Sequence, residues 1–279
     1  MKNVISFIKK YSVSVILPIA ILIIWQVVAL AVGNRALVPT VGAVVNRLLH
    51  PFADLLSIGN YLHHISASFI RVIMGFSFAI LVGIPLGLLA GRMFLLNRMI
   101  NPVIEFLRPI CPIAWIPFTM VIFRTYTVAD AFGAHYTKSI FGDIQIGMLM
   151  IIFYGGFFPV FVNTVYGVTS VRNIYIESAQ LLGCDKRRLF RKVILPSALP
   201  SILTGLRIGL GTAWMVIVAA EMLPGSEAGL GYLIMYSYEL ADMDIMLTSI
   251  ILIGTIGALL SHGVKLIEDR TSKWQAKER

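Results

Sequence analysis

The sequence predicts an all-α polytopic membrane protein with six transmembrane helices, and three observations support that prediction. Hydrophobic residues make up 58% of the 279 residues and charged residues only 13%, too few to cover the surface of a soluble protein. Six apolar runs each have about the twenty residues that a bilayer requires. Lys and Arg residues gather in alternate loops. We therefore expect one multi-pass transmembrane domain over residues 1–279.

The first predicted span follows Lys2, Lys9 and Lys10, an arrangement that a secretory signal peptide also has. Its apolar run is long enough to cross, and no small-residue cleavage site follows it, so we interpret it as a retained helix. Basic residues concentrate at both termini, after the second span and before the fifth, which predicts that both termini are cytoplasmic. The six predicted spans are residues 13–33, 66–90, 103–123, 144–168, 198–222 and 246–266.

The second and third spans contain unusual residues. Gly83, Gly87 and Gly91 recur every four residues, a spacing that lets helices approach closely, either within the subunit or between two subunits. The segment 108–117 in the third span contains three prolines, each of which removes a backbone donor. Such a break is tolerated where it borders a watered cavity or other protein, so a transport pathway and a kinked structural helix are both open.

Charged side chains inside a membrane are expensive unless they snorkel, pair or face water. Arg207 lies well inside the fifth span, and Glu221 is too far along the same helix to pair with it. Glu105 is one turn from Arg108 and able to pair with it. For each charge we favour structural pairing and keep substrate contact as the alternative. The candidate pathway residues are Arg108, Trp115, Arg207, Trp214 and Glu221.

A polar, strongly basic stretch separates the fourth and fifth spans. Asn173 is a possible N-cap for a short helix, and Gly183 is a suitable C-terminal stop. Asp185 is a suitable N-cap for a second short helix, and Pro196 fits the first turn of the next span. The stretch is therefore expected to hold short helices outside the membrane. A plain solvated basic loop that obeys the positive-inside rule is the alternative.

The spacing of this stretch resembles the "EAA" loop of permease subunits of binding-protein-dependent ABC importers. The resemblance implies the type I ABC-importer permease fold, a location in the bacterial inner (plasma) membrane, and a cytoplasmic loop, residues 169–197, that couples the permease to a separate ATPase. We call these residues the EAA-type loop. Two small departures are Ser178, where the family usually has Ala, and Val193, where it usually has Ile. The coupling residues implied by the match are Glu177, Ser178, Ala179, Gly183, Leu195 and Pro196.

Further segments resemble the nitrate/sulfonate/taurine group of these permeases, over residues 37–270. They include the proline-rich 108–117, the run 195–211 and Ala-Glu-Met-Leu at 220–223. The resemblance implies two ATP-binding cassette ATPase subunits, a second permease copy, expected as a homodimer, and an external solute-binding protein. It implies a small anionic substrate such as a sulfonate, taurine, nitrate or bicarbonate, with a heterocyclic vitamin precursor as the alternative.

One segment departs from this group. The outer link at residues 124–143 is longer than usual, and its interleaved aromatic and charged residues suit either contact with the binding protein or packing at the lipid interface. In addition, Cys111 stands where a proline is usual. Both departures concern the outer entrance, so they bear on which substrate is carried.

The sequence also excludes several classes of function. It contains no Walker A loop, dinucleotide fingerprint, nucleophile elbow or zinc-protease motif, so we expect a transport subunit that is not an enzyme and has no cofactor and no metal. The net charge of +9 falls in loops beside the spans, which suits the lipid bilayer as a partner rather than nucleic acid. A secondary transporter or channel driven by an ion gradient is the alternative, but the spans contain few acids for coupling.

Overall fold

The protein is all-helical wherever the computed structural model describes it, as predicted. The described residues are 2–55, 57–123, 126–131, 144–222 and 226–271, with the backbone alone for 2–15 and 131. Within these ranges β-type pairing amounts to one isolated bridge between Thr127 and Gln145. The elements are α1 (Lys2–Val32), α2 (Val41–Leu49), α3 (Tyr61–Arg92), α4 (Phe94–Leu107), 3₁₀ helix η1 (Pro112–Trp115), α5 (Ile116–Phe123), α6 (Val128–Ala131), α7 (Ile146–Thr169), α8 (Asn173–Leu181), α9 (Lys186–Leu189), π-helix η2 (Phe190–Ile194), α10 (Leu195–Glu221), α11 (Leu230–Glu239) and α12 (Met243–Thr271).

Four helical stretches of the described chain are long and apolar enough to cross a membrane: α3, α7, α12 and the continuous stretch Lys186–Glu221. The bent pair Phe94–Leu107 and Pro112–Phe123 is a fifth if both helices belong to one span. In α1, the apolar stretch with described side chains is Ile16–Val32. The number of six spans and the cytoplasmic location of both termini therefore stay predictions.

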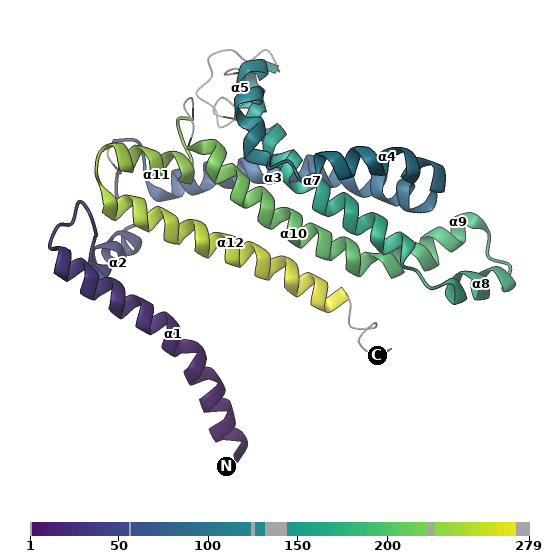
Figure 1. The fold of residues 1–279 in the computed structure, drawn as a ribbon, viewed down its shortest axis with the longest axis horizontal. Helices are drawn as coiled ribbons and strands as arrows, with labels where there is room; N and C mark the ends of the chain where they lie inside the picture. Colours follow the sequence, from purple (N-terminus) through teal and green to yellow (C-terminus); the bar gives the residue numbers. More distant parts are fainter. Residues whose placement is uncertain (1, 56, 124–125, 132–143, 223–225, 272–279) are drawn as a thin grey trace.

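The third predicted span, residues 103–123, is wrong in its boundaries, but it contains the break that its prolines indicated. Helix α4 begins at Phe94, soon after α3 ends, and α5 stands at 85° to α4 after a break. Figure 1 shows α5 crossing the long axis of the molecule. The break follows from Pro109 and Pro112, which cannot donate the hydrogen bonds that would continue the helix. The prolines predicted a break, but neither the angle nor the early start of α4.

Helix α7 lies between α3 and α10, and these three helices form the centre of an elongated bundle (Figure 1). Small residues allow this close approach. A Cβ added at Gly87 of α3 would lie 2.7 Å from the Cβ of Thr164 on α7, and one at Gly205 of α10 would lie 2.7 Å from the Cβ of Asn163. Gly83 and Gly91 also face valines of α7. The glycine face of the second span therefore packs within the subunit.

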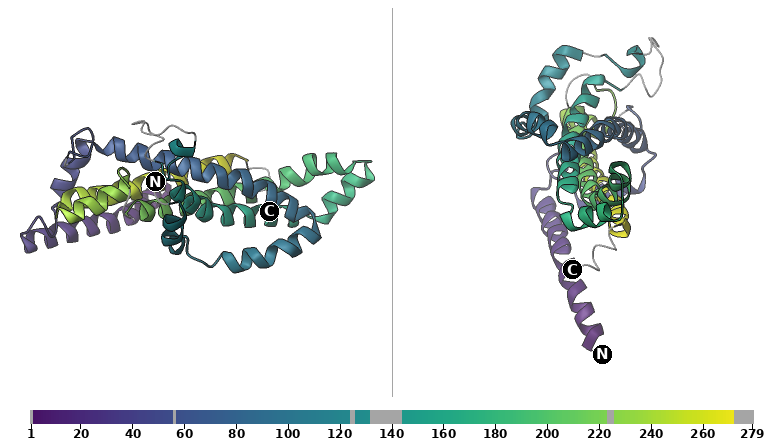
Figure 2. Two further views of the ribbon diagram at one scale, coloured as in Figure 1. Left: turned by 90° about the horizontal axis from the view of Figure 1, so that it is seen from above. Right: turned by 90° about the vertical axis from the view of Figure 1, so that its right-hand side faces the viewer.

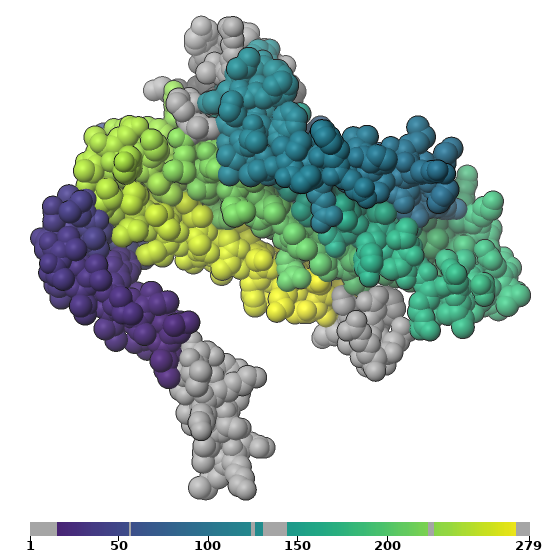
Figure 3. Space-filling model, in the orientation of Figure 1, coloured from purple at the N-terminus to yellow at the C-terminus, as the bar shows by residue number. Residues whose placement is uncertain are grey.

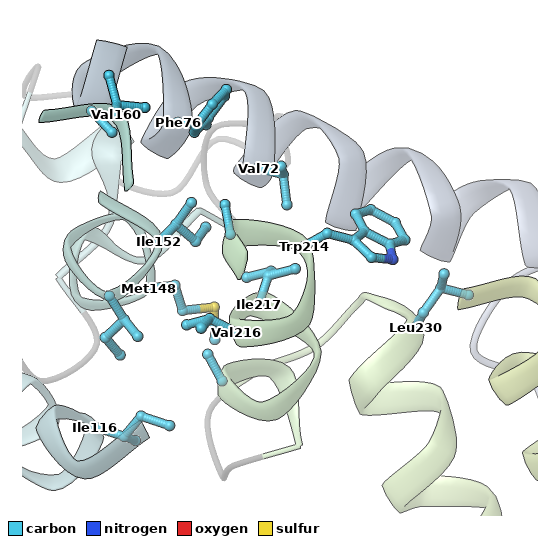
Figure 4. Packing of buried hydrophobic residues seen from close by; sticks show 14 residues of the cluster. Val72, Phe76, Ile116, Met148, Ile152, Val160, Trp214, Val216, Ile217 and Leu230 are labelled. Carbon is cyan, nitrogen blue, oxygen red and sulfur yellow. The ribbon is translucent and has the colours of Figure 1, made fainter. Parts of the chain in front are cut away.

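The main apolar core is built where α3, α7, α10 and the start of α11 meet (Figure 4). Val72 and Phe76 of α3 are buried against Ile152 of α7 and against Trp214 and Ile217 of α10. In lipid there is little hydrophobic driving force between helices, so this core is held by close van der Waals packing and by internal hydrogen bonds. Its regular helices position the loops at both ends of the bundle.

Different helices lie at the two ends of the bundle. Helices α8 and α9 project from one end, beside the turn between α3 and α4, whereas α2 and α11 lie at the other end (Figures 1 and 2). Helix α1 stands away from the rest and contacts α2, as the space-filling view also shows (Figure 3). The Trp25 indole donates to the Pro39 carbonyl at 3.0 Å, which fixes the join between α1 and α2. Between Ile16 and Val32, the large aliphatic side chains of α1 are exposed, which suits a surface in lipid.

Candidate functional site

The EAA-type loop holds two short helices, as predicted. Helix α8 ends at Leu181, and Gly183 follows with φ +76°, the left-handed conformation expected of a glycine stop. The Asp185 carboxylate caps α9 by accepting from the Arg188 amide at 2.9 Å. The expected cap at Asn173 is wrong, because Asn173 is the first helical residue and Arg172 precedes it without a side-chain cap hydrogen bond.

The tip of this loop presents both charge and apolar surface. Glu177, Ser178 and Gly183 are exposed, with Glu177 on α8. Leu181 and Leu182, at the end of α8, are 89% and 87% exposed. A pair of large apolar side chains on a basic loop outside the bundle is typical of a surface that another protein covers. The capping residues and the motif spacing did not indicate this pair.

The base of the loop is attached to the bundle. The Arg92 guanidinium, at the end of α3, lies over the Phe190 ring at 5.2 Å and donates to the Lys186 carbonyl at 3.4 Å. From Lys186 the helix runs on without interruption through η2 into α10, where Leu195 and Pro196 form the first turn. A displacement of α9 would therefore reach α10 through continuous helix rather than through a flexible link.

A cavity of about 270 Å³ lies beside the break after α4. Its walls come from the α4–η1 segment, α7 and α10, and Arg108 is the one charged residue among its described lining residues. Of the candidate pathway residues, Arg108 lines this cavity. The described lining is Arg108, Ile110, Pro112, Tyr154, Gly155, Phe158, Pro159, Val162, Asn163, Ile208 and Thr212.

Proline in α7 creates part of the polarity of this cavity. Pro159 has no N–H to donate to the carbonyl of Gly155, four residues earlier. The Thr212 hydroxyl of α10 donates to that carbonyl at 2.8 Å and so replaces the missing hydrogen bond. The Tyr154 hydroxyl similarly donates to the Leu107 carbonyl at the end of α4. These bonds connect the broken helix to α7 and α10.

The remaining candidate pathway residues lie in different surroundings. Arg207 pairs with Glu268 of α12 at 3.0 Å, and Thr204 donates to the same carboxylate at 2.6 Å. Trp214 is buried in the core, where its indole donates to the Ile253 carbonyl at 3.0 Å. Trp115 is half-buried, with its ring 5.7 Å from that of Tyr154. Sequence reasoning missed Glu268, because a residue 61 positions away gives no local signal.

Glu221 belongs to a buried polar cluster made by His64, Ser68 and Arg71 of α3 and Glu221 of α10. Its carboxylate accepts from the Arg71 guanidinium and from the Ser68 hydroxyl, each at 2.8 Å. Glu221 and Arg71 are both at most 1% exposed. The pairing of Arg71 with Glu221 is an example of the structural pairing that we favoured for these charges.

The buried polar cluster also holds the start of α11. The Gly231 amide donates to Glu221 at 3.1 Å, and the Gly229 amide donates to His64 Nδ1 at 3.1 Å. These amides belong to the turn that begins α11, where they lack helical partners. Tyr232 stacks on His64 with ring centroids 6.2 Å apart, and burial raises the pKa of Tyr232. The cluster thus joins three helices at the end of the bundle opposite the EAA-type loop.

The outer link at 124–143 falls largely outside the described residues. Of this segment the structure describes 126–131, which includes α6. The Asp130 carboxylate accepts from the Thr127 amide at 2.9 Å, at the start of that helix. The Ile146 amide donates to the Tyr126 carbonyl at 3.0 Å, so the two ends of the link are close together. Its function stays a prediction.

The chain is similar to known membrane transport proteins along most of its length. The family described as "binding-protein-dependent transport system inner membrane component" matches residues 83–273. A putative ABC transporter permease of Methanocaldococcus jannaschii is 42% identical over 96% of this chain and 93% of its own length. A bicarbonate transport permease of Synechococcus elongatus is 34% identical over 91% of this chain and 88% of its own. The taurine transport permease of Escherichia coli is 32% identical over 92% and 87%.

The fold is also similar to that of a solved transporter. An inward-facing methionine ABC transporter chain aligns with a TM-score of 0.58 and covers 75% of this chain and 95% of that chain. The sequence identity over this alignment is 18%, so the similarity concerns the fold alone.

Proposed function

Because the chain belongs to the family of binding-protein-dependent transport system inner membrane components, we propose that it forms the translocation pathway of an ATP-driven importer for a small anion. It is a multi-pass permease of the inner membrane. The observation that carries the proposal is the EAA-type loop, in which Glu177, Ser178 and Gly183 are exposed on short helices outside the bundle. The absence of an ATP-binding motif in the sequence assigns ATP hydrolysis to a separate subunit.

The proposed complex contains two ATPase subunits, a second copy of this permease and an external solute-binding protein. The Glu177–Gly183 segment docks on the ATPase, with Ala179 at the half-buried side of α8 and the two exposed leucines completing the docking surface. ATP-driven closure of the ATPases moves α8 and α9 as a rigid body. The continuous helix from Lys186 to Glu221 supports transmission of that motion into the membrane, with Leu195 and Pro196 at its entry.

The proposed substrate class is a small anion such as a sulfonate, taurine, nitrate or bicarbonate. Two similar permeases carry the names of bicarbonate and taurine transport systems. The cavity beside Arg108 supports the same class, because its single charged lining residue among those described is a cation. Arg207, Trp214 and Glu221 are joined to other helices of the subunit, so their proposed part in the pathway is to hold its walls, with Trp115 beside the cavity residue Tyr154.

The test reverses the charge at the docking surface. In the reconstituted complex, Glu177→Arg is expected to weaken ATPase assembly or to uncouple hydrolysis from uptake, while the permease still inserts. The matched control is Glu239→Arg, an equally simple charge reversal on an exposed residue of α11 at the other end of the bundle. Normal substrate-stimulated hydrolysis by Glu177→Arg would count against the coupling role. Uptake that continues without ATP but follows an imposed ion gradient would support the secondary-transporter alternative instead.

A further inference from the structure

Among the described side chains that line the cavity beside the α4–η1 break, Arg108 offers the most hydrogen-bond donors to a ligand, and the Asn163 amide keeps one further N–H. The three neutral polar side chains of the cavity each donate to a backbone carbonyl: Tyr154 to Leu107, Asn163 to Pro159 and Thr212 to Gly155. Two of these bonds, to Leu107 and Gly155, satisfy carbonyls that the helix break and Pro159 leave open. The Arg108 guanidinium has five N–H donors in a planar fork.

Arg108 has no carboxylate partner in the part of the chain that the structure describes. The expected partner one turn earlier, Glu105, instead accepts from the Asn101 amide at 2.7 Å. The ion pairs found among described residues are Arg47–Asp242, Arg71–Glu221, Arg188–Asp185 and Arg207–Glu268. Arg108 therefore differs from Arg71 and Arg207, which pair with Glu221 and Glu268, because none of the described acids of the subunit neutralises its charge.

Arg108 lies far from the α3–α4 turn, which matters because it has no described carboxylate partner. Helix α4 has 14 residues and is therefore about 21 Å long, so Arg108 at its far end is separated from the α3–α4 turn by much of a bilayer's thickness. A cation at such depth is costly unless it faces water or a partner. The side chain is exposed and lines the cavity, so an anion that enters the cavity can reach the guanidinium.

The rest of the lining limits the ligand. Among the described residues no carboxylate lines the cavity, so none of them would neutralise an ammonium group there. A guanidinium fork matches the paired oxygens of a carboxylate, nitrate or sulfonate. Pockets for drug-sized ligands have volumes of about 300–1,000 Å³, and this cavity of about 270 Å³ lies below that range. Val162, Phe158 and Ile208 offer an apolar wall for a short alkyl tail.

We propose that this cavity is an anion-binding site in which Arg108 holds a small monovalent oxyanion that has no ammonium group, which removes taurine from the substrate class proposed above. The proposal deepens the proposed function and rests on it for the statement that this anion is the transported substrate. The occupancy of the cavity itself is independent of any ATPase, so it is tested on the full-length permease in membranes.

The experiment measures chemical access to the cavity. Ile208, which lines the cavity and is 46% exposed, is replaced by Cys in a Cys111→Ser/Cys184→Ser background. Two methanethiosulfonate reagents of similar size are compared, one with a sulfonate and one with a trimethylammonium group. With Arg108 present, the sulfonate reagent is expected to react relatively faster, and Arg108→Gln is expected to lower the ratio of the two rates about tenfold. Arg108→Lys keeps the charge and most of the ratio.

Arg98→Gln is the matched control, because Arg98 is an arginine at the start of the same helix and does not line the cavity. Ligand specificity is read from protection of the introduced thiol in the Ile208→Cys variant. Ethanesulfonate and nitrate are expected to slow labelling at least about threefold, and taurine, which adds an ammonium group to ethanesulfonate, to slow it less. An unchanged rate ratio in Arg108→Gln would overturn the site, and equal protection by taurine and ethanesulfonate would overturn the exclusion of ammonium.

These outcomes are distinct from a failure of the proposed function. Suppose that no ATPase assembles with the permease, but that the ratio of the two labelling rates and the protection of the thiol both depend on Arg108. The anion site is then supported and the importer function is wrong. Suppose instead that the assembled complex hydrolyses ATP and takes up substrate, but that the ratio of the two labelling rates does not change in Arg108→Gln. The importer function is then supported and the anion site is wrong.

Discussion

Glu221 and Arg71 form a charge pair that is buried completely inside the subunit. The desolvation of both charges is offset by hydrogen bonds: Glu221 accepts from the Ser68 hydroxyl and the Gly231 amide, and Arg71 donates to the Ala228 carbonyl. Removing one partner of such a pair leaves an uncompensated buried charge, which costs far more than the net stability of the intact pair. The Arg207–Glu268 pair is a useful comparison, since Arg207 is 35% exposed and Glu268 17% exposed.

We expect Glu221→Ala to lower the free energy of unfolding by about 3–5 kcal/mol, because Arg71 is left buried without its carboxylate. The double variant Arg71→Met/Glu221→Leu is expected to lose less, since neither charge remains. The measurement is thermal unfolding of the purified permease in detergent, with Glu268→Ala as the control for loss of a partly exposed pair. A loss in Glu221→Ala no larger than that in Glu268→Ala would contradict this account.

At the scale of single elements, the short helices of the EAA-type loop depend on one backbone conformation. Gly183 has φ +76°, and a Cβ added there would meet no described atom within 4 Å. A substitution is therefore opposed by the backbone alone and not by crowding. Substitutions at Gly183 therefore test the left-handed backbone conformation and not the space around the residue.

Gly183→Val is expected to destabilise the turn between α8 and α9 by about 1–2 kcal/mol, because a β-branched residue is strained in the left-handed region. Gly183→Asn, which tolerates that region, is the matched variant and is expected to preserve the loop. The measurement is co-purification of the ATPase with the permease, together with substrate-stimulated hydrolysis. If Val and Asn behave alike, the left-handed turn does not matter for coupling.

The interface between α3 and α7 depends instead on space. A Cβ at Gly87 would lie 2.7 Å from the Thr164 Cβ and 3.0 Å from the Phe161 carbonyl oxygen, which is backbone and cannot turn aside. At Gly211 of α10, a Cβ would meet no described atom within 4 Å. The same change, Gly to Ala, therefore has different consequences at these two positions.

Gly87→Ala is expected to reduce stability by about 1–3 kcal/mol through overpacking, whereas Gly211→Ala is expected to be neutral or slightly stabilising. Thermal unfolding in the same detergent compares the two variants with the parent protein. Equal unfolding temperatures for both variants would mean that α3 and α7 separate easily, and the close-packing account would then be wrong.

For the whole molecule, the two ends of the bundle are predicted to lie on opposite sides of the membrane. The turn between α3 and α4 lies at the end where α8 and α9 project, and the turn between α11 and α12 lies at the other end (Figure 1). Phe94 is 79% exposed near the first turn and Leu240 is 53% exposed in the second. The distribution of Lys and Arg predicts that the first turn is cytoplasmic.

In a background without native cysteines, Leu240→Cys is expected to react with a membrane-impermeant maleimide in intact cells. Phe94→Cys is expected to react only after permeabilisation. The opposite pattern would invert the orientation, and labelling of both sites in intact cells would mean that the two turns lie on the same side.

The sequence by itself determined the membrane class, the positions of most helices and the local structure of the EAA-type loop. These features depend on interactions between near neighbours. A run of apolar residues predicts a span because backbone groups in lipid must be satisfied within the segment. Likewise, Asp185 caps α9 and Gly183 stops α8 through contacts with residues a few positions away. Contacts between residues a few positions apart can be predicted from the sequence alone.

The tertiary structure alone decided which charges are neutralised and which are not. Arg71 with Glu221, and Arg207 with Glu268, pair across different helices, so their distances depend on how α3, α10 and α12 pack. Glu105, which is close to Arg108 in sequence, instead accepts from Asn101. The 85° bend after α4 also depends on tertiary packing. The prolines permit a break there, but the packing of η1 and α5 against α7 sets its direction. Helix packing, rather than proximity in the sequence, thus determines that Arg108 lines a cavity without a described carboxylate partner.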